Sequence, residues 1–146
     1  MRLLPAIFSL ALIGMPCGSA HAQQPDATLL PGGERVIVFF AWDRPIIDGD
    51  AAAQLDVVAA AFERSPNARI NLSGHADRSG PGAPNLRSGR QRADAVHAYL
   101  ASRGVPGAAM SVMSYGETRP LIATADGVRE PQNRRVEVVV MRAPGR

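Results

Sequence analysis

The chain has 146 residues, with 16 basic residues against 13 acidic ones. This length accommodates one domain of ordinary size and excludes two. All the basic residues are arginines interleaved with acidic residues, and the sequence holds only one tryptophan and two tyrosines. Because no basic strip with stacking aromatic side chains is present, the composition argues against nucleic-acid binding.

Residues 1–22 have the pattern of a cleavable signal peptide. A positively charged start is followed by an apolar stretch at residues 3–13 and by Ala20-His21-Ala22. This combination is typical of an export signal, and the apolar stretch is shorter than the roughly 20 residues that span a bilayer. We therefore expect cleavage after Ala22, an exported, periplasmic protein, and no transmembrane segment in the mature chain.

The only cysteine, Cys17, lies within this leader. A lipoprotein signal places Leu and small residues before its lipid-modified cysteine, whereas Gly14, Met15 and Pro16 precede Cys17. The mature chain is therefore predicted to have no thiol, disulfide or lipid anchor, which suits an oxidising compartment such as the periplasm.

After a flexible N-terminal lead-in at residues 23–33, one domain is predicted at residues 34–142. Apolar residues spaced i, i+3, i+4, i+7 indicate helices, and alternating or β-branched runs indicate strands. In chain order we expect first a strand at 34–40, a helix from the caps Asp48 and Asp50 to about Arg64, and a strand at 69–73. A loop at 74–84 then leads to a second helix that runs to about Ser102 and is closed by Gly104. A short strand at 110–115, a long loop at 116–132 and a last strand marked by Val136, Val138 and Val140 complete the domain.

The second predicted strand alternates cleanly. Ile70 and Leu72 are apolar, whereas Arg69, Asn71 and Ser73 are polar. Such alternation leaves one face of a sheet in contact with water, so both helices should cover the other face. The sequence predicts an α+β fold, a two-layer α/β sandwich of order β-α-β-α-β-β with two helices on one face of a mixed sheet.

A carboxylate and a guanidinium are predicted to lie together beyond the end of this strand. Asp77 follows the strand, and Arg92 lies fifteen residues later in the early turns of the next helix. Ligands of α/β layers usually bind in the crevice beyond strand ends. Asp77 would accept an ammonium, and Arg92 would bind a carboxylate in bidentate fashion. From spacing alone, a solvated salt bridge between Asp77 and Arg92 is the more frequent outcome.

The sequence resembles the OmpA-like peptidoglycan-binding domain over about residues 34–142. The resemblance is carried by four blocks in order: Gly74-His75-Ala76-Asp77, then Asn85 with Arg92-Ala93 and Val96, then Ser114-Tyr115-Gly116-Glu117 with Pro120, and Asn133-Arg134-Arg135-Val136. A further block, Phe40-Ala41-Trp42-Asp43, is most similar to the peptidoglycan-associated lipoprotein branch.

The resemblance implies non-covalent binding of the diaminopimelate side chain of the peptidoglycan stem peptide, without catalysis or a cofactor. Asp77 and Arg92 would be the principal contacts, and Asp43 and Asn85 would line the same pocket. The Asn133-Arg134-Arg135 block would tie the long loop to the last strand. Such a protein would link the cell wall to the outer membrane or to a periplasmic protein partner.

Three positions depart from the family pattern. Ala76 stands where Thr is usual, Pro84 where Tyr is common, and Ser88 where Leu is usual. The first two changes remove a hydroxyl and a ring from the surroundings of the ligand. An alternative is therefore an OmpA-like scaffold with a decayed pocket that acts as a protein-interaction module.

Other chemistries have weaker support in the sequence. Asp43 and Asp77 could serve as the paired carboxylates of a cell-wall hydrolase, although nothing marks either one as a raised-pKa acid. His75 and Asp77 could begin a metal site, but no further ligands stand at suitable spacing. The sequence contains no Gly-x-Ser-x-Gly elbow, the motif that would indicate a serine hydrolase. His97 is interpreted as a half-buried packing residue on the second helix.

Overall fold

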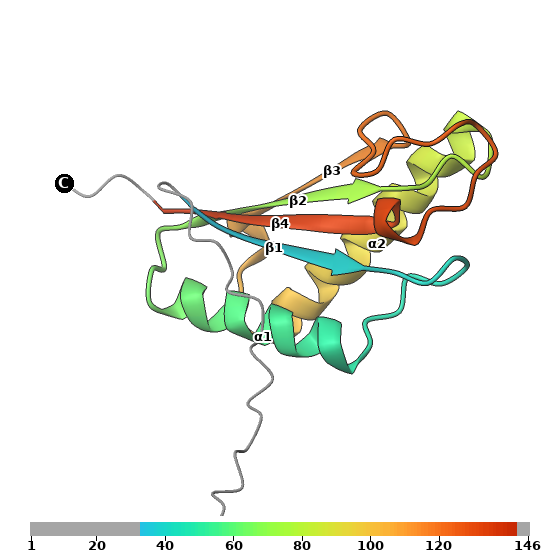
Figure 1. Ribbon diagram of the computed structural model, residues 1–146. Coiled ribbons are helices and arrows are strands. Elements are labelled where there is room, and N and C mark those ends of the chain that lie inside the picture. The colour runs from blue at the N-terminus through green and yellow to red at the C-terminus, as the bar shows by residue number, and fades with distance from the viewer. Residues whose placement is uncertain (1–32, 143–146) are drawn as a thin grey trace, which may run out of the picture.

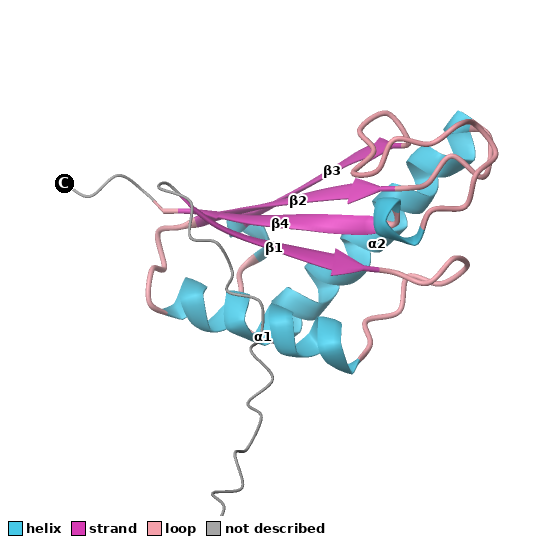
Figure 2. Cartoon of the chain, viewed as in Figure 1, coloured by secondary structure: helices cyan, strands magenta, loops and turns pink. Residues whose placement is uncertain are grey.

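Four strands form one open sheet, and two helices cover a single face of it (Figures 1 and 2). This arrangement is seen in a computed structural model that describes residues 33–142, and it confirms the predicted two-layer α+β fold. The predicted signal peptide, Cys17 and nearly all of the lead-in lie outside the described residues. The elements are β1 (Gly33–Phe39), α1 (Gly49–Glu63), β2 (Arg69–His75), α2 (Gly82–Ser102), the 3-10 turn η1 (Gly107–Ala109), β3 (Met110–Gly116), the 3-10 turn η2 (Pro131–Asn133) and β4 (Arg135–Met141).

The strand order brings distant parts of the chain to one edge of the sheet. The order is β1-β4-β2-β3, in which β4 is antiparallel to both β1 and β2, and β3 is parallel to β2. The carboxyl ends of β1, β2 and β3 therefore meet the amino end of β4 at the same edge. Segments that follow or precede these ends lie within reach of one another, although up to about a hundred residues separate them along the chain.

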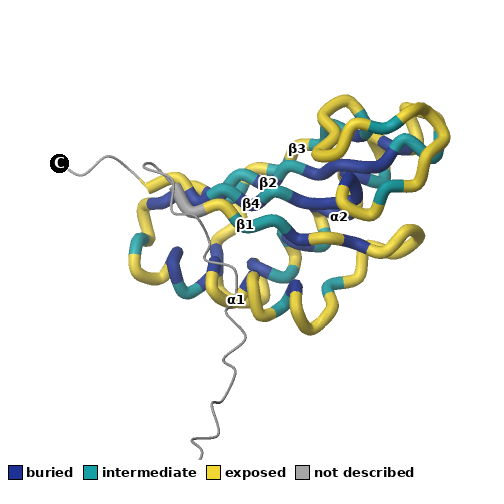
Figure 3. The backbone as a smooth tube through the Cα atoms, in the orientation of Figure 1, coloured by how far each residue is buried: buried dark blue, intermediate teal, exposed yellow. Residues whose placement is uncertain are grey.

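The apolar core lies between the sheet and the helices (Figure 3). Alternate residues of the strands face the core, as the predicted alternation requires, and each fully buried aliphatic side chain contributes roughly 1.5–3 kcal/mol of transfer free energy. None of the helices in residues 33–142 is long and apolar enough to cross a lipid bilayer. The largest fully buried apolar side chains are Val38, Leu55, Val58, Ile70, Leu72, Val96, Leu100, Val136, Val138 and Val140.

The predicted helix start at Asp48 is confirmed, because its Oδ1 accepts a hydrogen bond of 2.8 Å from the Ala51 N–H. The predicted loop at 74–84 is wrong at both ends, since β2 continues to His75 and α2 begins at Gly82. Pro84 does not prevent this, because N–H groups in the first turn of a helix have no intrahelical acceptor. Consequently Arg92 lies in the middle of α2 and not in its early turns.

Helix α2 approaches the sheet closely where two glycines face each other. A Cβ atom at Gly74 of β2 would overlap the backbone carbonyl of Gly89 of α2. Because the obstructing atoms belong to the backbone, no side-chain rotation could relieve the overlap. The absence of a side chain at Gly74 therefore sets the distance between α2 and β2.

We expect Gly74→Ala to lower the free energy of unfolding by about 3 kcal/mol, because α2 must move away from the sheet to admit the methyl group. Gly49→Ala is the matched control, since nothing lies within 4 Å of the position of its Cβ. That variant should be neutral or slightly stabilised. Urea unfolding followed by circular dichroism measures both, and equal stabilities would contradict the close approach.

Candidate functional site

A hollow of about 140 Å³ opens at the edge where the strand ends meet, beside the N-terminal half of α2. Three of the four predicted site residues, Asp77, Asn85 and Arg92, line this hollow. Asp43 does not line it, but belongs to a smaller adjoining hollow that also contacts Arg92. The complete lining of the larger hollow is Trp42, Ala76, Asp77, Ser79, Gly80, Asn85, Ser88 and Arg92.

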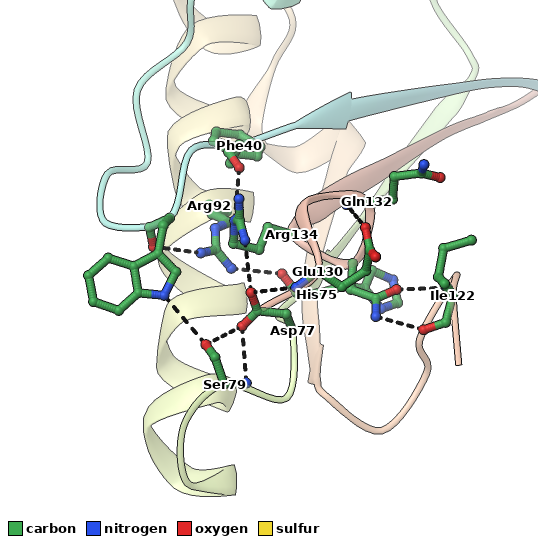
Figure 4. Close-up of polar contacts among 11 residues, drawn as sticks. Phe40, His75, Asp77, Ser79, Arg92, Ile122, Glu130, Gln132 and Arg134 are labelled. Carbon is green, nitrogen blue, oxygen red and sulfur yellow. Dashed lines mark hydrogen bonds and ion pairs between the residues drawn. The ribbon is translucent and has the colours of Figure 1, made fainter. Parts of the chain in front are cut away.

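Asp77 is buried and forms an ion pair with Arg134, not with Arg92 (Figure 4). Its Oδ2 accepts hydrogen bonds from Arg134 Nη1 at 2.8 Å and from the Glu130 N–H at 3.3 Å. Its Oδ1 accepts from the hydroxyl of Ser79 at 2.6 Å and from the Ser79 N–H at 3.3 Å. The solvated salt bridge between Asp77 and Arg92, which was the alternative from spacing, is therefore absent from residues 33–142.

These hydrogen bonds keep Asp77 ionised. Burial acts to raise the pKa of its carboxyl group, but the hydrogen bonds from Ser79 and Arg134 outweigh burial and hold the pKa below its usual range. Asp77 is thus a fixed negative charge at neutral pH, and Arg134 neutralises it. The pair contributes no net charge to the hollow.

Arg92 is similarly buried, at 5% exposure, but it pairs with no acidic side chain of the described residues. Its Nη1 donates to the backbone oxygen of His75 at 2.9 Å, and its Nη2 donates to that of Trp42 at 3.4 Å. None of the ion pairs within residues 33–142 includes Arg92. Burial, followed by repulsion from Arg134, lowers the pKa of Arg92, while Asp77 acts in the opposite direction. Since arginine remains protonated in proteins, the hollow carries one uncompensated positive charge and suits an anionic group.

Asn85 holds the chain segments that frame the hollow. Its Nδ2 donates to the Gly80 backbone oxygen at 2.8 Å and to a carboxylate oxygen of Glu117, which follows β3. The side chain thereby connects the turn before α2 to the end of β3. Within the described part of the chain, no cluster of three or more His, Cys, Asp or Glu side chains is arranged to hold a metal ion.

The Asn133-Arg134-Arg135 block has the structural role that the resemblance implied, and one further role. Asn133 Oδ1 accepts from the N–H groups of Leu121 and Ile122, so it ties the long loop to the start of β4. Arg134 also reaches across to Asp77, while its Nε donates to the Phe40 backbone oxygen at 3.2 Å. The sequence carries no signal for this second role, because no spacing rule connects residues that lie 57 positions apart.

His75 ends β2 on the face of the sheet that the helices leave uncovered. It is 2% exposed, its ring stacks on Tyr115 at 5.5 Å, and its Nε2 lies 3.8 Å from Glu137 Oε1. Burial and then the positive charge of Arg135 lower the pKa of His75 from its ordinary value of 6.5 to about 4, although Glu137 opposes this shift. At neutral pH the imidazole is uncharged.

His97 is half-buried on α2, which confirms the prediction of its burial.

The lowered pKa of His75 predicts a loss of stability in mild acid. Between pH 6.5 and 4 the unfolded chain binds a proton that the folded chain excludes, so stability is complete above this window and falls as the pH drops through it. We expect the free energy of unfolding to fall by about 2 kcal/mol between pH 7.5 and 5. His75→Gln should remove most of this slope.

Urea unfolding at several pH values measures the effect, with His97→Gln as the matched control that keeps the slope. The carboxylates of Asp77 and Glu137, whose pKa values are lowered, begin to lose their contributions only as the pH falls toward their ordinary values of 3.8 and 4.5, below the compared range of pH 7.5 to 5. An unchanged slope in His75→Gln would show that another group causes the acid sensitivity.

Comparisons with known proteins identify the relatives of this chain. The OmpA family matches residues 39–134. The chain is 39% identical over 129 residues to a peptidoglycan-associated lipoprotein of Rhizobium meliloti, covering 88% of this chain and 72% of the relative. It is also 39% identical over 124 residues to the protein of the same name from Agrobacterium fabrum, covering 84% and 68% respectively.

A solved structure shows the same fold. The crystal structure of the peptidoglycan-associated lipoprotein from Burkholderia pseudomallei superposes with a TM-score of 0.67 at 30% identity, covering 72% of this chain and 89% of that chain. The family match spans both helices and the segments that form the hollow, from the end of β1 to Arg134. The chain therefore belongs to the OmpA family.

Proposed function

We propose that this protein binds peptidoglycan non-covalently, through the diaminopimelate side chain of the stem peptide, and links the cell wall to the outer membrane or to a periplasmic partner. The names of its relatives, peptidoglycan-associated lipoproteins, support this function. The observation that carries it is the buried guanidinium of Arg92, which pairs with no carboxylate of the described residues and lines a hollow whose other charged lining residue, Asp77, is neutralised by Arg134.

The free end of diaminopimelate bears an ammonium and a carboxylate on one carbon, and the uncompensated charge of Arg92 suits the carboxylate. The N–H groups of Arg92 that do not bind backbone oxygens are available to a ligand carboxylate. Among the described residues, Asp77 Oδ1 accepts only from the hydroxyl and the N–H of Ser79. A rotation of the Ser79 side chain would therefore make room for the ligand ammonium. In this proposal Arg92 and Asp77 are the principal contacts, while Asn85 supports the rim and Asp43 stands in the adjoining hollow.

One stem peptide would bind with modest affinity. Charge-assisted hydrogen bonds contribute about 1.5–3 kcal/mol each, and the loss of translational and rotational freedom offsets much of that gain. Retention on the cell wall would come from rebinding among many identical stem peptides on the polymer.

The electrostatics of Asp77 support binding without catalysis. A glycoside hydrolase needs one carboxyl group with a raised pKa as its general acid. Asp77 has the opposite shift, because Ser79 and Arg134 stabilise its charged form. Asp43, the other carboxylate considered for a hydrolase, is exposed beside Arg44 at 3.7 Å.

The departures from the family pattern leave the charged groups in place. Ala76 and Ser88 line the hollow, and Pro84 is exposed in the first turn of α2. Ala76 and Pro84 remove contacts without introducing a side chain that would fill the hollow. We therefore favour a functional pocket over a decayed one.

We also propose that the protein acts in the cell envelope after export, with cleavage following Ala22. A mature chain beginning at Gln23 should be found by intact-mass measurement of the protein from the periplasm. A diacylglycerol mass on Cys17 would contradict both the cleavage site and the absence of a lipid anchor.

The pocket is tested by co-sedimentation with purified sacculi. Arg92→Ala and Asp77→Asn should each weaken binding about tenfold to a hundredfold, at 1.4 kcal/mol per decade, because each leaves one ligand charge unpaired. Arg92→Lys should restore binding only partly, since an ammonium cannot form the bidentate contact. Arg90→Ala is the matched control, because Arg90 is an exposed neighbour on the same helix that pairs with Asp94.

Asp77→Asn is preferable to Asp77→Ala, because it keeps the shape of the buried side chain beside Arg134 and lowers the risk of unfolding. Circular dichroism verifies that each variant is folded. Failure of the wild-type protein to co-sediment would favour the interaction scaffold, and release of soluble muropeptides would indicate a hydrolase. Folded Arg92→Ala and Asp77→Asn variants that bind like wild type would overturn the assigned pocket.

A further inference from the structure

Trp42, the only tryptophan of the chain, lies at the rim of the pocket and is half exposed. It lines both the larger hollow and the smaller adjoining one, and 51% of it remains accessible to solvent. A large aromatic side chain gains more from burial than smaller ones, so a ligand that covered Trp42 would gain from this contact.

The indole ring is held in a defined orientation. Its Nε1 donates to the Ser79 hydroxyl at 3.4 Å, and the Arg129 guanidinium stacks over the ring 4.1 Å from the centroid. The backbone oxygen of Trp42 accepts from Arg92, so the residue that carries the ring also orients the cation of the pocket. A ring that is already ordered loses little conformational entropy when a ligand stacks on it.

The smaller hollow next to Trp42 offers polar groups that have no partner within the described residues. Ser88 and Gln91 of α2 line it together with Asp43, and neither the Ser88 hydroxyl nor the Gln91 amide forms a hydrogen bond within residues 33–142. Its volume of about 30 Å³ is small, so it can take the edge of a ring but cannot enclose one. Arg92 lies between this hollow and the larger one and lines both.

We propose that Trp42 and the smaller hollow form a second subsite, which binds a pyranose ring of the glycan strand beside the stem-peptide pocket. A pyranose presents an apolar C–H face and a rim of hydroxyl and amide groups. The apolar face would stack on the indole, and the polar rim would bond to Asp43, Ser88 and Gln91. This inference rests on the proposed function, because the sugar and the stem peptide would be parts of one ligand.

The second subsite would let the protein distinguish free stem peptides from stem peptides attached to sugar. A pocket for diaminopimelate alone would bind a free stem peptide and a sugar-bearing muropeptide equally well. With a sugar subsite, the protein prefers stem peptides that are still attached to the glycan over peptide fragments released by cell-wall turnover. Shed peptides would then compete poorly with the intact wall.

The experiment compares three soluble ligands by calorimetry: a stem peptide, a muropeptide with the same stem peptide on its disaccharide, and glycan strands without peptides. For the wild type we expect the muropeptide to bind about threefold to tenfold more tightly than the stem peptide. In Trp42→Ala this ratio should fall to about one, and in Trp42→Phe it should stay above one. Arg92→Ala should weaken both peptide ligands, and glycan strands alone should bind weakest.

Met113→Ala is the matched control, because Met113 is a comparably exposed apolar residue on the uncovered face of the sheet. A second readout uses the single tryptophan. Its fluorescence should change more with the muropeptide than with the stem peptide.

Equal affinities of the wild type for stem peptide and muropeptide would overturn the sugar subsite and leave the proposed function standing. An unchanged ratio in Trp42→Ala would do the same. A wild-type protein that binds neither peptide ligand would instead overturn the proposed function, and the subsite with it.

Discussion

The buried ion pair between Asp77 and Arg134 organises the edge of the sheet at which the candidate site lies. Asp77 follows β2, Arg134 precedes β4, and further hydrogen bonds from this pair reach Phe40 after β1 and Glu130 in the long loop. Four chain segments thus meet at two side chains. Removing one partner of such a pair leaves an uncompensated buried charge, which typically costs about 3–5 kcal/mol. The hollow exists because these segments are held together around it.

The close contact between α2 and β2 decides where the remaining charge stands. Gly89 packs against Gly74, and Arg92 lies three residues further along α2, on the same face of the helix. The helix is therefore near enough for the guanidinium to reach the backbone oxygen of His75 at the end of β2. Arg92 donates to backbone oxygens, which do not neutralise its charge, whereas Arg134 is paired with the carboxylate of Asp77. This difference between two neighbouring arginines leaves the site with one positive charge for a ligand.

The charges around this edge keep their states across the neutral range. Hydrogen bonds and neighbouring arginines hold the pKa values of Asp77 and Glu137 below their usual ranges against the effect of burial, while burial keeps His75 neutral. Ligand binding of the proposed kind would then need no change of protonation. Specificity would come from geometry, with fixed charges for the peptide part, and with a stacked ring and the polar groups of Asp43, Ser88 and Gln91 for the sugar part.

The sequence by itself determined the element order, the helix cap at Asp48 and the alternating faces of the strands, because local periodicity and capping encode these features. It also placed Asp77 and Arg92 together beyond the end of a strand, and the family resemblance added Asn85 to them. Tertiary structure alone decided that Asp77 pairs with Arg134, that Asp43 stands in a separate hollow, and that Trp42 forms the rim common to both hollows. It also decided that α2 begins before Pro84, since a proline is compatible with the first turn of a helix as well as with a loop. The partner of a buried charge depends on which strand ends meet at one edge of the sheet. Strand order and packing across the whole domain decide which ends meet, and no local pattern of residues specifies either of them.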